Sequence, residues 1–129
     1  MIPKPNITGL HFVSLYFPDV QSAREFYTKA IGEPAFSDSE TSTYGWNLQS
    51  SWLTFLPASA GTKPSALPRN TEFGLCVATP EDVDLLVRRF VLAGAREHMK
   101  PHDTTMYIPM RFACVDDPFG VRIDIYCPL

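Results

Sequence analysis

The chain of 129 residues has a formal net charge of -3, with 45% hydrophobic and 19% charged residues. This length suits one compact unit with a core of its own, and the mild negative charge, without a dense Lys/Arg run, argues against nucleic acid as a partner. No apolar run approaches the length of a membrane span, and the first residues lack the apolar region of a signal peptide. We therefore expect a cytoplasmic protein with no membrane partner.

The first half of the chain predicts one strand, one helix and three further strands. Residues 8–17 have the composition of a strand, and residues 18–32 follow as an amphipathic helix that begins after Asp19, a good N-cap, and stops at Gly32. One helical face collects apolar residues at a spacing of three to four, namely Val20, Ala23, Phe26, Tyr27, Ala30 and Ile31. Three short strand-like runs complete this half, at residues 33–38, 42–48 and 51–58.

The second half repeats this plan. Residues 71–78 predict a strand, and residues 80–94 predict an amphipathic helix. The apolar face of that helix contains Val83, Leu86, Val87 and Phe90. Strand-like runs follow again, at residues 95–101, 106–116 and 120–127.

The repeated plan predicts an α+β fold. We expect two βαβββ modules that form a curled mixed sheet around a cavity, with both helices on the outer face. A stretch rich in Pro, Ser and Ala separates the halves, so we place module one at residues 7–57, a linker at 58–70 and module two at 71–129. The whole chain, residues 1–129, is then a single domain.

Side chains alternate between the two faces of a strand, so the apolar pattern predicts which residues face the cavity. His11 shares its parity with the apolar, helix-covered face of its strand, which predicts a hydrogen-bonded core residue. Glu72 and Asp124 would attract a cationic ligand, while Arg111 and Arg122 would neutralise them or clamp an anionic group. The predicted ligand-binding residues are Phe12, Tyr16, Trp52, Thr54, Glu72, Arg111, Arg122, Asp124 and Tyr126.

Two segments carry a family resemblance. The first is "FPDVQSAREFYTKAIG", residues 17–32, and the second is "DDPFGVRIDIY", residues 116–126. They resemble the strand-to-helix segment and the terminal hairpin of the vicinal oxygen chelate superfamily, which includes glyoxalase I, the bleomycin-resistance proteins and the extradiol dioxygenases. Together with the paired plan, the resemblance covers nearly the whole chain and implies paired βαβββ modules.

The resemblance also implies where a divalent metal ion would bind. Metal-dependent members take one ligand from each of four strands, at positions that fall here on Phe12 or its neighbour His11, on Thr54, on Glu72 and on Asp124. Phenyl and hydroxyl groups are poor ligands for such an ion, which prefers imidazole or carboxylate groups. No cofactor is therefore favoured. The alternative is a metal held by His11, Glu72 and Asp124, with a bulge or register shift that turns His11 to the cavity.

We therefore favour a metal-independent binding protein that resembles the bleomycin-resistance proteins, which are antibiotic-resistance proteins, and sequesters an aromatic or cationic small molecule. The alternative is a metal-dependent glyoxalase-like lyase or isomerase, or a dioxygenase. The sequence does not decide whether the protein is an enzyme, and Glu72 and Asp124 are the candidate catalytic groups, as an acid/base pair. The resemblance further implies a homodimer.

Overall fold

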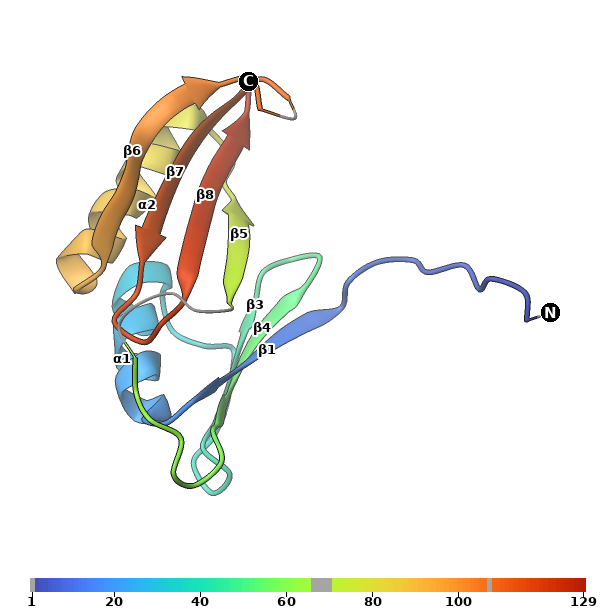
Figure 1. Cartoon of the computed structure of the whole chain (residues 1–129), viewed down its shortest axis with the longest axis vertical. Coiled ribbons are helices and arrows are strands. Elements are labelled where there is room, and N and C mark those ends of the chain that lie inside the picture. Colours follow the sequence, from blue (N-terminus) through green and yellow to red (C-terminus); the bar gives the residue numbers. More distant parts are fainter. Residues whose placement is uncertain (1, 66–70, 107) are drawn as a thin grey trace.

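Eight strands and two helices are found in the computed structural model, which describes residues 2–65, 71–106 and 108–129 (Figure 1). Module one consists of β1 (Phe12–Phe17), α1 (Val20–Ile31), β2 (Phe36–Asp38), β3 (Thr43–Asn47) and β4 (Trp52–Pro57). Module two consists of β5 (Glu72–Cys76), α2 (Pro80–Ala93), β6 (Arg96–Thr104), β7 (Met110–Asp116) and β8 (Arg122–Pro128). The predicted α+β fold of two βαβββ modules is confirmed. The predicted linker, residues 58–70, lies partly outside the described residues.

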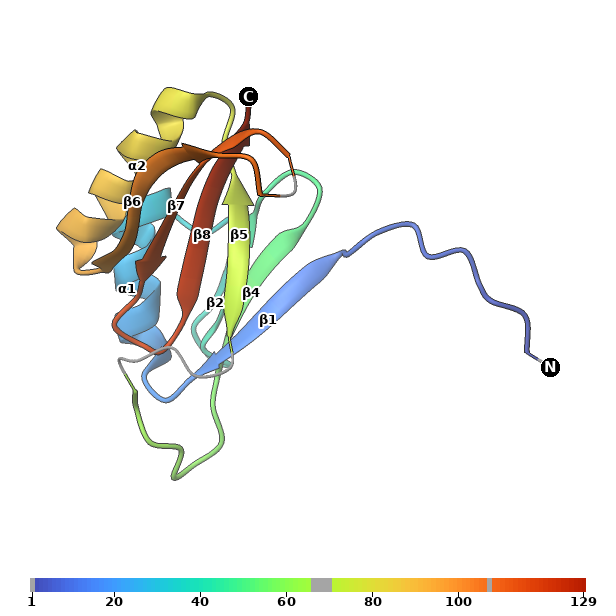
Figure 2. The same cartoon turned by 45° about the horizontal axis from the view of Figure 1, so that its top comes forward.

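Each module builds its own four-stranded mixed sheet. The strand orders are β1-β4-β3-β2 and β5-β8-β7-β6. The first and last strands of each module are parallel, which the intervening helix allows, and the remaining neighbours are antiparallel. Both sheets stay open, and in Figure 2 one helix lies behind each sheet while the opposite face is uncovered.

The strand registers make the two modules equivalent position by position. Ser14 of β1 lies opposite Thr54 of β4, and Gly74 of β5 lies opposite Asp124 of β8. Each of these is the third residue of its strand. Thr54 and Asp124 therefore occupy equivalent positions in the two modules, and so do the first residues of β1 and β5.

Both helices begin and end at residues suited to those places. The Asp19 carboxylate accepts hydrogen bonds from the Ser22 backbone N–H at 3.1 Å and the Ser22 hydroxyl at 2.7 Å, which satisfies the start of α1. Gly32 ends α1 with φ at 95°, a conformation that favours glycine. Thr79 caps α2 through the Asp82 N–H. Within the described residues, no helix has the length and apolarity needed to cross a membrane.

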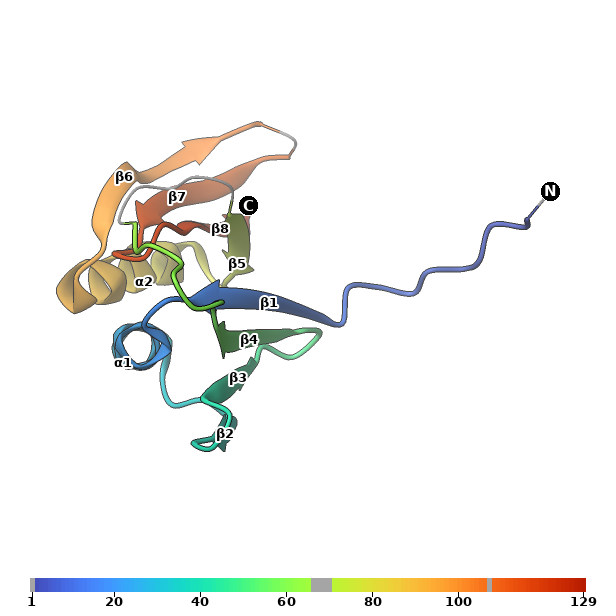
Figure 3. The ribbon, with the colours of Figure 1, turned by 60° about the horizontal axis from the view of Figure 1, so that its bottom comes forward.

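The two modules meet through their helices. Figure 3 shows α1 and α2 side by side, with the two sheets diverging from them. Arg89 of α2 donates from Nε to the carbonyl oxygen of Ala30 at 2.8 Å and so satisfies an end of α1. Between the helices and the sheets lies an aromatic cluster, which contains Phe17, Phe26, Tyr27, Phe55, Phe90 and Phe119. The core is thus shared by both modules.

A buried hydrogen bond also connects the modules. Tyr27 of α1 donates from its hydroxyl to Asp117 Oδ2 at 2.7 Å, and both residues are almost fully buried. The other oxygen of Asp117 accepts the N–H groups of Phe119 and Val121, which fixes the turn between β7 and β8. Burial raises the pKa of both the Asp117 carboxyl and the Tyr27 hydroxyl. The helix of module one is therefore tied to the last hairpin of module two.

The start of the first strand differs from the prediction. Pairing in β1 begins at Phe12, and residues 2–11 extend away from the body in all three views (Figures 1, 2 and 3). His11 is exposed, so the prediction of a core histidine is wrong. The alternation of side chains predicts burial only for residues of the strand that the helix covers. His11 precedes β1, so this rule does not apply to it. Its carbonyl oxygen still accepts the Trp52 N–H at 2.9 Å.

The strand predicted at residues 95–101 is longer than expected. β6 continues through Pro101 to Thr104 and has register irregularities between Glu97 and His102. β6 pairs with β7 on one side only, at the edge of its sheet. A proline fits in such a strand because the missing N–H can lie on the unpaired side or at a bulge.

Removing the hydrogen bond between the modules should destabilise the protein. Tyr27→Phe leaves Asp117 Oδ2 buried without this donor, so we expect the free energy of unfolding to fall by about 1–3 kcal/mol. Urea unfolding followed by circular dichroism measures this. Tyr16→Phe is the matched control, because the Tyr16 side chain is exposed. Equal stability of the two variants would contradict a role for the Tyr27–Asp117 bond.

Candidate functional site

The helix-free faces of the two sheets carry most of the predicted site residues. In module one, Leu15 and Phe17 are buried on the α1 side, whereas Phe12 and Tyr16 are 55% and 64% exposed. Trp52 and Thr54 lie on the same open face, partly buried. The predicted parity of β1 and β4 is therefore confirmed.

Aromatic side chains spread over the open face of module one. A Cβ added at Gly45 would lie 3.2 Å from Trp52 Cε3 and 3.6 Å from Phe36 Cβ, so the absence of a side chain at Gly45 lets the indole lie close against the sheet. Phe12 is opposite Trp52 in the parallel register. We call Phe12, Phe36 and Trp52 the aromatic shelf. Flat aromatic area of this kind suits stacking with a planar ligand.

The hydroxyl groups beside the shelf bond to each other. Ser14 Oγ and Thr54 Oγ1 are 2.5 Å apart, and Thr54 Oγ1 also donates to the Val13 carbonyl oxygen at 3.2 Å. Thr54 has its hydrogen-bonding capacity largely filled within the sheet. It contributes little free polarity to this face.

The open face of module two carries charge. Glu72 and Cys76 of β5 share this face with Arg122, Asp124 and Tyr126 of β8, because residues paired in register point the same way. The parity predicted for these strands is confirmed. Module two thus supplies charged groups at positions where module one supplies apolar and hydroxyl groups.

Asp124 has an acceptor without a partner. Its Oδ1 atom is buried, and no hydrogen bond to it exists among the described residues. Burial, followed by the neighbouring Glu72 carboxyl, raises the pKa of Asp124 to about 6, while Cys114 and Arg122 act in the opposite direction. An unsatisfied buried acceptor is costly, which makes Asp124 a candidate for a ligand contact among the described residues.

Cys114 lies beside Asp124 and was missed by the sequence analysis. The two residues are opposite each other in the antiparallel register of β7 and β8. Burial and then the Asp124 carboxylate raise the pKa of Cys114 to about 12. The side chain therefore stays a thiol at neutral pH, which disfavours a nucleophilic role.

Arg122 lies on the open face of β8, but its guanidinium is already paired. It donates from Nε and Nη2 to Asp116 at 2.8 and 3.1 Å, and Arg96 approaches the same carboxylate at 3.7 Å. The bidentate bond to Arg122 holds the pKa of Asp116 below its usual range. Arg122 therefore holds Asp116 in place at the end of the open face. Because Asp116 already occupies these donors, Arg122 is a poor candidate for binding an anionic group of a ligand.

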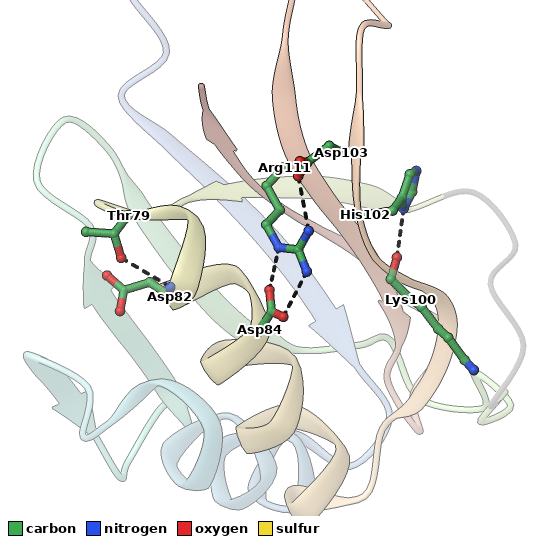
Figure 4. A network of polar contacts seen from close by, with 7 residues as sticks. All are labelled: Thr79, Asp82, Asp84, Lys100, His102, Asp103 and Arg111. Atoms are coloured by element: carbon green, nitrogen blue, oxygen red, sulfur yellow. Dashed lines mark hydrogen bonds and ion pairs between the residues drawn. The ribbon is translucent and has the colours of Figure 1, made fainter.

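The prediction that Arg111 lines the cavity is wrong. Arg111 donates to both carboxylate oxygens of Asp84 on α2, at 2.7 and 2.9 Å, and to Asp103 at 3.0 Å (Figure 4). It lies opposite Cys127, on the helix-covered side of the sheet. Arg111 therefore fastens α2 to β6 and β7, beside a polar hollow of about 450 Å³ on that side of the molecule.

The cause of this error is the register of the last hairpin. The turn pairs Asp116 with Arg122, which places Cys114 opposite Asp124 and Phe112 opposite Tyr126. The open face of β7 is consequently Met110, Phe112, Cys114 and Asp116. If Asp116 and Arg122 are taken as the pair that flanks the turn, counting two residues further along each strand places Cys114 opposite Asp124. This count would have identified the open face of β7 from the sequence.

A smaller hollow lies where the modules meet. It has a volume of about 260 Å³. Its lining includes Ser14 and Tyr16 from the open face of β1, and Gly120 and Val121 from the hairpin turn of module two. This hollow adds concave surface next to the aromatic rings, which is a common setting for small-molecule binding.

The residues present do not fit a divalent metal ion. The positions equivalent to Glu72 and Asp124 hold Phe12, whose ring offers no ligand atom, and Thr54, whose hydroxyl is bonded within the sheet. His11, the proposed substitute, is exposed ahead of β1. Across residues 2–65, 71–106 and 108–129, no group of three or more His, Cys, Asp or Glu side chains is placed to hold a metal. Two carboxylates alone fall short of the ligand number such ions require.

The chain belongs to the Glyoxalase/Bleomycin resistance protein/Dioxygenase superfamily, whose family model matches residues 9–125. This confirms the resemblance to the vicinal oxygen chelate proteins. The match spans both modules and both open faces. A search of curated protein sequences finds no significant match.

Solved structures share the same fold. A glyoxalase/dioxygenase from Nostoc punctiforme superposes with a TM-score of 0.77 at 18% identity, covering 100% of this chain and 97% of that one. A glyoxalase/bleomycin resistance protein from Albidiferax ferrireducens T118 gives 0.76 at 17% identity, covering 91% and 97%. A glyoxalase-related enzyme from Fulvimarina pelagi gives 0.74 at 18% identity, covering 94% and 88%. At this identity the likeness shows the fold alone.

The raised pKa of Asp124 predicts how stability depends on pH. The folded protein holds this proton up to about pH 6, above the usual value of 3.8, so stability should fall as pH rises through this window and then level off. Asp124→Asn should therefore be more stable than the wild type at pH 8, by roughly 1 kcal/mol after allowance for solvent screening.

Urea unfolding at pH 4 and pH 8 tests this expectation. The difference between the variant and the wild type should shrink towards zero at pH 4. Glu97→Gln is the matched control, since Glu97 is an exposed carboxylate on the helix side of the same sheet, opposite Val115. If the stability difference between Asp124→Asn and the wild type is the same at pH 4 and pH 8, the pKa of Asp124 is not raised.

Proposed function

We propose that this protein binds a small aromatic or cationic organic molecule without a metal ion, in the manner of the bleomycin-resistance proteins. The observation that carries the proposal is the pair of carboxylates, Glu72 and Asp124, on an open sheet face that also carries Tyr126. A ligand with a positively charged hydrogen-bond donor would bind to such a pair. Superfamily membership supports small-molecule binding in general. The carboxylates and aromatic rings of the open faces favour an aromatic or cationic ligand.

The chemistry of the two faces supports an aromatic cation. The shelf offers ring surfaces for stacking, and Tyr126 offers one more ring beside the carboxylates. Glu72 and Asp124 add negative charge, whereas the guanidinium of Arg122 is engaged by Asp116. A ligand with a planar ring and a positively charged nitrogen would use both features at once.

We further propose a homodimer in which each cavity combines two protomers. Among the described residues, β1 pairs with β4 alone and β5 with β8 alone, so both strands leave one edge unpaired. Unpaired strand edges beside exposed aromatic rings favour association with a second copy of the chain. If module one of one protomer lies against module two of its partner, the shelf and Asp124 line the same cavity. This assembly is also the one that the family resemblance implies.

The first prediction concerns metal-free binding. Tryptophan fluorescence should reveal a compound that quenches saturably among cationic, neutral and anionic aromatic molecules, in buffer containing EDTA. Trp52 is on the open face, whereas Trp46 is buried and donates to the Gly32 carbonyl oxygen. Trp52→Phe should therefore abolish most quenching. Trp52→Ala should weaken binding, measured by calorimetry, roughly threefold to tenfold.

Leu92→Ala serves as the control, because Leu92 is an exposed apolar residue of α2 and not of the open faces. Its affinity should match the wild type. A requirement for added zinc, nickel or manganese would overturn the metal-independent proposal. Failure of every compound class to saturate would overturn binding itself.

The second prediction concerns the shared cavity. Light scattering should give about twice the chain mass of 14.5 kDa. Trp52→Ala and Asp124→Asn proteins, mixed and allowed to exchange subunits, should regain full affinity in about a quarter of the cavities, since half of random dimers are mixed and each has one intact cavity. Unchanged affinity in the mixture would mean that each protomer binds by itself.

A further inference from the structure

The residues ahead of β1 form an arm that their own sheet does not pair. Residues 2–11 extend away from the body in Figures 1, 2 and 3, and pairing with β4 begins only at Phe12. We call residues 2–11 the arm. Its apolar side chains Ile2, Ile7 and Leu10 are 93%, 77% and 70% exposed. Among the described residues, these side chains therefore lack cover from their own protomer.

The odd-numbered residues of β1 point towards β4. In a strand, the N–H and C=O groups of alternate residues point to the same edge. The carbonyl oxygens of His11 and Phe17 accept N–H groups from Trp52 of β4 and from Ala58 just after it, each at 2.9 Å. The even-numbered residues of β1 therefore point their N–H and C=O groups to the opposite edge, which β4 leaves free.

The same alternation places both prolines of the arm on the side of β4. If the arm continues β1 as a strand, the missing N–H groups of Pro3 and Pro5 fall on the odd-numbered edge. The even-numbered edge keeps every N–H group from Lys4 to Leu10 and continues into the free edge of β1. The arm therefore has one intact edge on which a further strand can pair.

β5 offers an edge suited to such a strand. Edge strands resist pairing when they are short, irregular, charged or contain proline. β2 has only three residues, and β6 has Pro101, several charges and register irregularities. β5 pairs with β8 in an unbroken register and contains no proline. Thr71 accepts the Arg122 N–H at 3.0 Å, so the odd-numbered residues of this segment face β8 and the even-numbered residues of β5 face the free edge.

The polarity of the arm matches that of β5. Even-numbered arm residues from Lys4 to Thr8 are polar, and the odd-numbered ones, such as Ile7, are apolar. In β5 the even-numbered residues lie on the charged open face, and Phe73 and Leu75 lie half-buried on the helix side. In an antiparallel pair, residues that bond to each other share a face. Antiparallel pairing would therefore put polar residues on the open face and apolar residues beside Phe73 and Leu75.

From this geometry we infer that residues 4–8 of one protomer pair, antiparallel, with the free edge of β5 in a second copy of the chain. Two-fold symmetry makes the exchange mutual, so that each dimer is held by two arms. The inference rests on the homodimer proposed above and specifies the contact that holds it. Because the arm continues into β1, the exchange brings module one of one protomer beside module two of the other. It also places Lys4, Asn6 and Thr8 at the rim of the charged face of the second copy.

Proline substitutions on the two edges of the arm test this pairing. Thr8→Pro removes an N–H group from the even-numbered edge, so the dissociation constant of the dimer should rise at least about tenfold. Ile7→Pro is the matched control, because it removes an N–H group from the odd-numbered edge, and it should change the dissociation constant by less than about threefold. Sedimentation velocity of the full-length variants over a concentration series measures both. The arm makes no contact that the fold needs, so neither variant should lower the temperature of thermal unfolding of the monomer.

A disulfide cross-link identifies the strand that receives the arm. Cys76 of β5 is exposed on the charged face, whereas Cys114 and Cys127 are buried. Oxidation with diamide, which takes two electrons and two protons from a pair of thiols, should link Lys4→Cys or Asn6→Cys to Cys76 of a second copy. The product is a covalent dimer of about twice 14.5 kDa on a non-reducing gel. Ile7→Cys lies on the other face and should not form it, and Cys76→Ser should abolish it.

The outcomes distinguish the arm exchange from the proposed dimer and from ligand binding. If Thr8→Pro and Ile7→Pro dimerise alike, the arm exchange is wrong while the dimer stands. A covalent dimer that persists after Cys76→Ser would mean that two arms pair with each other, and loss of free thiols without a covalent dimer would mean that the arm folds back on its own protomer. Both results would overturn the inference. A wild-type monomer would exclude the dimer together with the exchange, whereas the fluorescence screen decides ligand binding independently.

Discussion

The structure depends on one geometric constraint, which is that a single helix can cover only one face of a four-stranded sheet. Each βαβββ module has one helix, so each sheet buries one face and leaves the other open. The helices pack on each other and share an aromatic core, and this arrangement holds the two open faces on the outside. A surface that the chain cannot cover with its own elements is available for a ligand or a second copy.

The bond between Tyr27 and Asp117 decides how the modules are joined. Asp117 closes the last hairpin with one oxygen and accepts the Tyr27 hydroxyl with the other. The same hairpin turn brings Phe119 against the aromatic cluster. The turn that aligns β7 with β8, and therefore sets which residues flank Asp124, is thus held by a residue of the other module. The chemistry of the open face and the packing of the core are linked at this point.

The two modules have diverged in chemistry on an equivalent frame. Thr54 and Asp124 occupy the same register position, yet the hydroxyl is bonded within its sheet and the carboxylate has an oxygen without a partner. Likewise Ser14, whose hydroxyl bonds to Thr54, corresponds to Gly74, which has no side chain. Module one therefore offers ring surface and module two offers charge. A pair of modules with unlike faces suits a ligand with two unlike ends.

The sequence by itself determined the order of the elements, both helix starts and the faces of β1, β4, β5 and β8, because these follow from local capping and two-residue alternation. It failed where non-local pairing decides. Alternation alone did not give the face of β7, because that strand is apolar on both sides and only its hairpin register with β8 places Cys114, and not Arg111, beside Asp124. The exposure of His11 likewise depends on where the sheet begins. Alternation fixes relative sides within one strand, and tertiary packing alone fixes which side faces the open surface.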